Sequence, residues 1–306
     1  MVSINGDGNF TSKLSQTLDA SLSKLELPLA SVNIFLSITA SLGNALILIA
    51  LHKVSSIHPP TKLFFRCLAV TDLCVGLLVH PLYVTVNLSR VTEVSKNDLY
   101  YIYEVSRVSN WILCAVSVLT STAISVDRLL ALLLGLRYKH VVTLRRVRVA
   151  IICFWFTGVF AGSIRIWRRD ISFMLGSVFL ALSLVTSIFC YTRIHLKLRH
   201  RQVQQQNNVP KRRANGGGIP LNILRYRKSV SSILWVQLAL VACYGPWAFL
   251  AILFVFGGID NDVAWIITTV LLHFNSTLNP ILYCWKIGAV RRAVRATIKQ
   301  LDCFFR

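Results

Sequence analysis

Long apolar blocks separated by polar and basic segments dominate the pattern of this chain. Seven blocks come close to the roughly 20 residues that a helix needs to cross the hydrocarbon core of a bilayer. Blocks of this length are typical of a multi-pass membrane protein rather than of a soluble domain. They lie near residues 29–51, 63–87, 99–134, 149–168, 171–192, 232–257 and 264–285.

The fourth and fifth blocks are almost continuous, and one very long helix is the simpler interpretation. The sequence "RIWRRD" at 165–170 interrupts them with three arginines and an aspartate. Because charged side chains are costly inside hydrocarbon, we predict two helices that meet at a membrane surface.

Composition supports a membrane protein, and the placement of charge predicts its orientation. The chain is 55% hydrophobic, with a mean hydropathy of +0.60 and a formal net charge of +21. With the N-terminus outside, most of the 33 Lys and Arg residues fall on the cytoplasmic side, as the positive-inside rule requires. We therefore expect a multi-pass protein of the plasma membrane that contacts anionic lipid and binds no nucleic acid.

The pattern divides the chain into three parts: an extracellular N-terminus (1–27), a seven-transmembrane domain (28–285), and an amphipathic helix with a short tail (286–306). A stretch rich in Gln, Asn, Gly, Lys and Arg, at about 198–224, predicts a flexible third inner loop. Apolar residues recur at helical spacing in the last part, opposite basic ones, which predicts a helix on the inner leaflet. These apolar positions are Ile287, Val290, Val294, Ile298 and Leu301.

Two positions are candidates for covalent modification. Asn9 begins the sequon Asn-Phe-Thr and is a candidate for glycosylation on the extracellular side. Cys303 follows the amphipathic segment, where palmitoylation and an unmodified thiol are about equally consistent with the sequence.

Polar and helix-breaking residues lie inside the blocks, where lipid-facing helices would not keep them. Each block with such residues carries a short motif that contains a polar, aromatic or proline residue. In chain order the motifs are Gly43-Asn44, Leu68–Asp72, Asp127-Arg128-Leu129, Trp155, Cys243–Pro246 and Asn279–Tyr283.

In this order, one per block, the motifs resemble those of rhodopsin-like (class A) G protein-coupled receptors over residues 28–303. The resemblance implies an all-α bundle of seven helices that is a receptor and not an enzyme. Such a receptor converts binding of an extracellular ligand into activation of a heterotrimeric G protein. A very short second outer loop, no bridging cysteine and no proline in the fifth block resemble melanocortin receptors, whereas "HFNSTLNPILY" resembles adenosine receptors.

The resemblance assigns an activation switch to the cytoplasmic half. It implies that Asp127 restrains Arg128 in the resting receptor and that Arg128 contacts the G protein after activation. The alternative is a pair at a helix end whose charges reach the aqueous surface. Prolines interrupt the helical hydrogen bonding and permit movement of the inner halves. The other implied members of the switch are Tyr191, Pro246, Asn279, Pro280 and Tyr283.

A carboxylate in mid-membrane needs partners, and Asp72 is the candidate centre of a sodium site. The alternative is a purely structural polar cluster at a helix junction. Apart from this possible allosteric ion, we expect no cofactor. The oxygen-bearing residues that the resemblance places around Asp72 are Ser117, Asn275, Ser276 and Asn279.

The resemblance places the ligand between the outer halves of the third, fifth, sixth and seventh blocks. Amine receptors carry an aspartate at the position of Asn110, so a buried ammonium would lack its counter-charge here. A neutral polar small molecule, a peptide or a lipid remains. Arg165, Arg168 and Arg169 could attract an acidic ligand, but we favour a solvated rim for them. The predicted lining is Asn110, Trp111, Cys114, Leu175, Phe179, Tyr244, Trp247, Thr269 and His273.

A transporter or channel is the alternative function for seven helices with buried polar groups. Many transporters show repeat symmetry or interrupted helices in matching halves, and the sequence displays neither.

Overall fold

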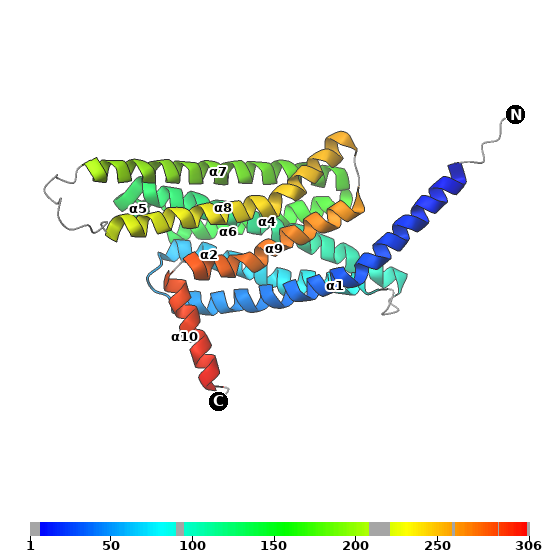
Figure 1. Ribbon diagram of the computed structural model, residues 1–306, viewed down its shortest axis with the longest axis horizontal. Coiled ribbons are helices and arrows are strands. Elements are labelled where there is room, and N and C mark those ends of the chain that lie inside the picture. Colours follow the sequence, from blue (N-terminus) through cyan, green and yellow to red (C-terminus); the bar gives the residue numbers. More distant parts are fainter. Residues whose placement is uncertain (1–6, 90–94, 208–220, 259–260, 287, 305–306) are drawn as a thin grey trace.

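The computed structural model describes residues 7–89, 95–207, 221–258, 261–286 and 288–304. In these ranges long helices lie side by side, and the last helix projects from one end of the bundle (Figure 1). The helices are α1 (Asp7–Lys53), α2 (Pro59–Cys74), the π-helical turn η1 (Val75–Val79), α3 (His80–Asn87), α4 (Lys96–Leu134), the 3₁₀ turn η2 (Gly135–Arg137), α5 (Tyr138–Val141), α6 (Leu144–Trp167), α7 (Arg169–Asn207), α8 (Leu221–Gly257), α9 (Asp262–Lys286) and α10 (Gly288–Phe304).

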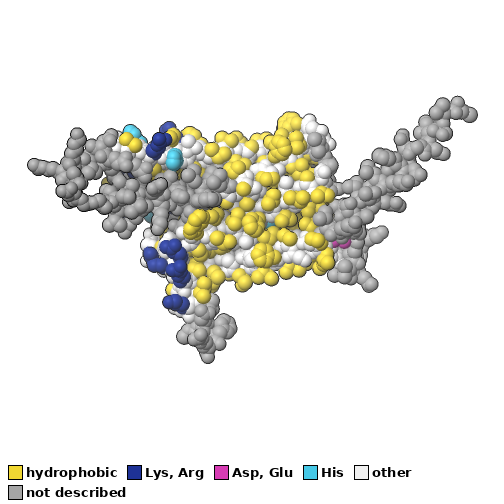
Figure 2. Space-filling view, viewed as in Figure 1, with side chains coloured by type: hydrophobic (Ala, Val, Ile, Leu, Met, Phe, Trp, Pro, Cys, Tyr) yellow, Lys and Arg dark blue, Asp and Glu magenta, His cyan; other side chains and the backbone are white. Residues whose placement is uncertain are grey.

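Within the described residues, six helical segments are long and apolar enough to cross a membrane. Helix α9 is not among the six, and its apolar run includes the buried polar residues His273, Asn275 and Asn279. It packs against α1 and α8 and completes the bundle. Hydrophobic side chains cover the middle of the face shown in Figure 2, as expected for a surface in contact with lipid.

The break predicted at "RIWRRD" is confirmed, because α6 ends at Trp167 and α7 begins at Arg169. The second block is less regular than the sequence pattern indicated. One π-helical turn separates α2 from α3, directly before Pro81. A proline in a helix removes one N–H donor and clashes with the preceding turn, so a local change of winding relieves the clash.

Two small residues bring α6 close to α4. An added Cβ on Gly158 would lie 3.0 Å from the backbone oxygen of Ile112, and one on Gly162 would lie 2.6 Å from Cγ1 of the same residue. Membrane helices lack a hydrophobic driving force for association, so close packing through small residues four apart is a common solution. This contact fixes α6 against the helix that carries Asn110, Asp127 and Arg128.

The Gly43-Asn44 motif and Pro280 form one structural unit between α1 and α9. Pro280 has no N–H, which leaves the carbonyl of Ser276, one turn earlier, without its helical donor. Asn44 Nδ2 donates to this carbonyl at 3.0 Å and to the carbonyl of Ala40 at 2.9 Å. A side chain at Gly43 would crowd the Pro280 ring, since an added Cβ would lie 3.0 Å from Cγ.

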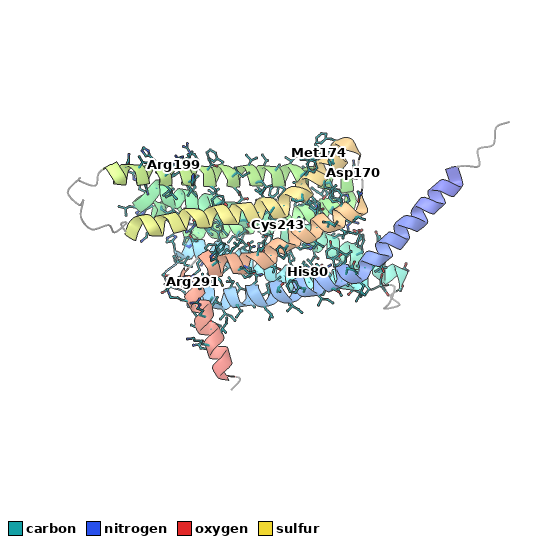
Figure 3. The ribbon with its side chains drawn as sticks, viewed as in Figure 1. His80, Asp170, Met174, Arg199, Cys243 and Arg291 are labelled. Atoms are coloured by element: carbon teal, nitrogen blue, oxygen red, sulfur yellow. The ribbon has the colours of Figure 1, made fainter. Side chains whose placement is uncertain are left out.

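The two ends of the bundle differ in charge. Figure 3 places Arg199 and Arg291 toward one end, whereas Asp170 and Met174 lie at the other. Lys and Arg side chains gather beside α10 on the face in Figure 2. Under the positive-inside rule, the end with Arg199 and Arg291 is the one expected on the cytoplasmic side.

Helix α10 is amphipathic, as predicted. Val290 and Val294 are buried in a cluster with Tyr283, whereas Arg291 and Arg295 are exposed. Lys53 at the end of α1 ties α10 to the bundle, because its Nζ donates to Thr297 Oγ1 at 3.1 Å and to Gln300 Oε1 at 2.7 Å.

Helical structure extends into the segment that the sequence indicated as a loop, since α7 continues to Asn207 and α8 begins at Leu221. Residues 208–220 lie outside the described part of the chain. The side chains of Asn9 and Cys303, the two candidate modification sites, also lie outside it.

Candidate functional site

A cavity of about 680 Å³ opens among the predicted outer halves of the helices, with a mainly apolar lining. Its size is in the range typical of small-molecule sites. Every residue predicted for the ligand pocket lines it, from Asn110 on α4 to His273 on α9. Sequence reasoning missed further lining residues on α1, α3, α4, α7 and α9, which are Asn33, Tyr83, Arg107, Phe173 and Trp265.

Aromatic rings from four helices form one wall of the cavity. Phe173 on α7 lies 4.9 Å from Trp265 and 6.2 Å from Trp247, measured between ring centroids. Trp111 on α4 meets Trp247 edge-on at 5.8 Å. Such rings offer a large, rigid apolar contact surface, so this wall suits the apolar body of a ligand.

A polar group of two histidines lies deeper in the bundle. His273 Nε2 lies 2.7 Å from Asn110 Oδ1, and His80 Nδ1 lies 2.8 Å from Asn33 Oδ1. The imidazole N–H donates in both pairs, because an amide oxygen only accepts. The two rings meet at 5.1 Å, so α1, α3, α4 and α9 are joined at the level of His80 (Figure 3).

Arg165 does not belong to a solvated rim, contrary to the interpretation favoured from sequence. Its side chain is buried, with 6% relative exposure, and it lines the cavity. The sequence places it one turn from the end of an apolar block, where an arginine usually reaches water. Arg168 is exposed, in agreement with a rim, and the side chain of Arg169 lies outside the described part.

Four of the five residues predicted for the sodium site take part in hydrogen bonds, Ser276 through its backbone. Asn279 Nδ2 donates to Asp72 Oδ2 at 2.8 Å, and Asn275 Nδ2 donates to the hydroxyl of Tyr244 at 3.0 Å. Ser276 contributes its backbone carbonyl to Asn44. Asp72 Oδ1 and Ser117 Oγ are buried without a hydrogen-bond partner among the described residues. Unsatisfied buried oxygens of this kind are the ligands that a hard cation prefers.

The half of the bundle predicted to face the cytoplasm holds a compact network around Asp127. Its Oδ2 accepts from Arg128 Nη2 at 2.7 Å and from Thr61 Oγ1 at 2.9 Å, and its Oδ1 accepts from the Tyr138 hydroxyl at 2.5 Å. Arg128 Nη2 also donates to Thr61 Oγ1 at 2.8 Å. The side chain of Asp127 is 2% exposed and that of Arg128 is 40% exposed, so the pair sits at an edge of the bundle.

The two inner tyrosines are engaged with other partners. Ser125 Oγ donates to the Tyr191 hydroxyl at 3.1 Å, and Tyr283 meets Phe65 edge-on at 5.0 Å. Among the described contacts, Arg128 bonds Asp127 and Thr61 and neither tyrosine. Helix α8 contains Pro246 within its length and changes direction along its course (Figure 1).

Comparison with known proteins identifies the bundle. The sequence profile of the 7 transmembrane receptor (rhodopsin family) matches residues 43–172 and 160–283. The chain belongs to the rhodopsin-like family of seven-transmembrane receptors. This family match confirms the multi-pass topology predicted from the apolar blocks and the receptor class predicted from the motifs, and its members are receptors and not enzymes.

Similar curated proteins of this receptor family include three kinds of receptor. The melanocortin receptor 5 of Rattus norvegicus is 26% identical over 89% of this chain and 84% of its own length. The adenosine receptor A3 of Ovis aries is 25% identical over 88% of this chain and 89% of its own. The histamine H2 receptor of Cavia porcellus is 27% identical over 91% of this chain and 80% of its own length. These relatives give no support to a transporter or channel.

Proposed function

We propose that this seven-transmembrane receptor lies in the plasma membrane with its N-terminus outside and converts binding of an extracellular ligand into activation of a heterotrimeric G protein. One observation carries the proposal. Helix α4 contributes Asn110 to the cavity and Arg128 to the inner network, about 27 Å apart along the helix at 1.5 Å per residue. A single rigid element therefore connects the ligand site with the surface that faces the cytoplasm.

The ligand is an extracellular molecule other than a simple amine. The three relatives are named for chemically different ligands, so their names do not select one. The cavity lining includes no Asp or Glu among the described residues, and Asn110 binds His273. A cationic amine would be buried there without a counter-charge, which costs more than it gains.

Activation releases Arg128 from Asp127. In the arrangement described here Arg128 is held by Asp127 and Thr61, which supports a resting state. Outward movement of the inner half of α8, permitted by Pro246, opens a space in which Arg128 meets the G protein and in which Tyr191 and Tyr283 reach it. Pro280 gives α9 the same freedom.

A sodium ion favours the resting receptor. Asp72, Ser117 and Asn279 would hold it, and Asn275 and Ser276 belong to the same layer; the orphaned oxygens of Asp72 and Ser117 support this assignment. The ion supplies positive charge beside a carboxylate that otherwise has one oxygen unsatisfied. Because a ligand shifts an equilibrium only by its differential affinity, the ion acts by binding the resting conformation more tightly.

Nucleotide exchange by purified G proteins tests the proposal. The full chain in lipid nanodiscs should accelerate exchange on at least one class of Gα subunit above the rate with empty nanodiscs. Arg128→Ala should abolish the acceleration at equal receptor amount, because the coupling guanidinium is lost. Arg148→Ala, an exposed arginine on α6, is the matched control and should retain it.

Loss of signalling in both variants, or in neither, contradicts the switch. An N-terminal epitope accessible only after cells are permeabilised contradicts the orientation. A transmembrane current without nucleotide exchange would support the alternative function of a transporter or channel.

A further inference from the structure

Arg165 occupies an unusual environment for a charged side chain. It lies in the last turn of α6 and lines the cavity, and its relative exposure is only 6%. Its guanidinium carbon lies 4.6 Å from the centre of the Phe173 ring and 5.8 Å from that of Trp111. The charge therefore faces aromatic surfaces inside the outer half of the bundle.

These aromatic contacts do not satisfy the guanidinium. Its Nε and Nη1 are buried without a hydrogen-bond partner within the described residues. The ion pairs described in the chain join Arg107 to Glu104 and Arg128 to Asp127, and neither includes Arg165. A buried charge is normally paired and hydrogen-bonded, because an unpaired one carries a large desolvation cost.

Arg165 is also the uncompensated charge of the described cavity lining. The charged residues of the described lining are Arg107 and Arg165. Arg107 Nη1 donates to Glu104 Oε1 at 3.3 Å, so its charge already has a partner on its own helix. Among the described lining residues, Arg165 alone combines burial with side-chain nitrogens that lack acceptors.

We propose that Arg165 is the anion-binding group of the ligand cavity, which takes the carboxylate, or another acidic group, of a small amphipathic molecule. The apolar body of that molecule packs against the aromatic wall of Trp111, Phe173, Trp247 and Trp265. Guanidinium groups bind carboxylates and phosphates through short charge-assisted hydrogen bonds, which supplies what Nε and Nη1 lack.

This inference rests on the proposed ligand cavity. It replaces the broad ligand class expected from the sequence with an acidic molecule. The acidic group can belong to a planar aromatic acid or to the head of a single-chain lipid. Both ligands carry the acidic group that Arg165 binds. They differ in the apolar part that packs against the aromatic wall, which is a planar ring in one and an alkyl chain in the other.

Thermal stability of the purified full chain in neutral-lipid nanodiscs provides the test, without any G protein. The acidic probes are indoleacetate, decanoate and decyl phosphate, and their matched neutral probes are indoleacetamide and decanol. An acidic probe should stabilise the native chain with an apparent affinity roughly tenfold above that of its neutral partner, as expected for a charged hydrogen bond. Tighter binding of indoleacetate would indicate an aromatic acid as the ligand, and tighter binding of decanoate or decyl phosphate would indicate a lipid.

Variants identify the responsible charge. Arg165→Gln keeps hydrogen-bonding capacity and removes the charge, so it should erase the preference for acidic probes. Arg165→Lys should retain part of the preference, which separates loss of charge from loss of folding. Arg168→Gln, at the exposed neighbouring arginine, should behave as the native chain.

Several outcomes would overturn the inference: no stabilisation by any acidic probe, equal stabilisation by acidic and neutral probes, or an unchanged preference in Arg165→Gln. Equal binding would mean that Arg165 only holds the aromatic wall together. Acid-selective binding by a chain that fails to promote nucleotide exchange would instead remove the proposed coupling and leave the acid site standing.

Discussion

Arg128 and Arg165 show two ways of placing a guanidinium within the same bundle. Arg128 is 40% exposed at its side chain and still has a carboxylate partner and a threonine hydroxyl. Arg165 is far more buried and has no carboxylate partner among the described residues. Burial of the charge is thus more costly for Arg165 than for Arg128, and yet Arg165 has fewer partners.

The difference indicates what completes each site. The carboxylate of the inner network is satisfied within the chain, since Asp127 receives bonds from three side chains, whereas Arg128 Nε is buried without a partner among the described residues. The bonds to Asp127 hold one arrangement and must be broken for Arg128 to move, as a switch requires. The outer cavity is left incomplete, and a site with unmet hydrogen-bond donors gains most from a molecule that arrives with acceptors.

Breaking the inner pair should give the largest effect. Asp127→Asn removes the charge that holds Arg128 and keeps the size of the side chain. Charge-assisted hydrogen bonds contribute about 1.5–3 kcal/mol, so the fraction of active receptor should rise roughly tenfold or more. Basal nucleotide exchange, divided by surface amount, measures it. Unchanged basal exchange at normal expression would remove Asp127 from the resting latch.

The polar layer between the two sites should give the next effect. Raising sodium at constant ionic strength, with choline as the replacement, should lower basal exchange of the native receptor about fivefold, a common size for allosteric coupling. Asp72→Asn keeps the hydrogen-bonding shape without the charge and should erase this dependence. If both proteins respond equally to sodium, the ion binds elsewhere.

Removal of one hydroxyl should sharpen the picture of the inner network. Tyr138→Phe deletes the donor to Asp127 Oδ1 and leaves Arg128 and Thr61 in place. A hydrogen bond contributes about 0.5–1.5 kcal/mol net, so basal exchange should rise roughly twofold to tenfold. Tyr101→Phe, at an exposed tyrosine in the outer half of α4, is the control and should leave exchange unchanged. A larger rise than in Asp127→Asn would contradict the central place of the carboxylate.

The smallest effect should come from the paired arginine of the cavity. Arg107→Gln removes a charge that Glu104 already compensates, and partly exposed ion pairs contribute little. The affinity for an acidic probe should change by about twofold or less, measured by the same thermal shift as for Arg165. A loss as large as that of Arg165→Gln would assign the anion to both arginines.

Several features of the fold follow from local physical chemistry and were predicted without a structure. Apolar length sets the spans, charge placement predicts the orientation, and "RIWRRD" separates α6 from α7. The motif residues also came from the sequence, because a polar group in hydrocarbon is rare enough to stand out. The nine predicted lining residues do share one cavity.

The partners of those residues depended on tertiary structure. Thr61 and Tyr138 are ordinary residues near helix ends, and no sequence signal marks them as the donors to Asp127. Asn44 donates a hydrogen bond to the Ser276 carbonyl, which lacks its helical donor because of Pro280, more than 230 positions from Asn44. Such pairs arise when helices pack, and the spacing along the chain does not encode them.

Arg165 marks the boundary between the two kinds of information. The sequence determined that it lies at the end of a span, where an arginine can reach water or face inward at similar local cost. Packing decided between these directions, because Phe173 and Trp111 enclose the guanidinium. Burial is a property of all the neighbours together, so the sequence supplied the charge and only the assembled helices decided that it faces the cavity.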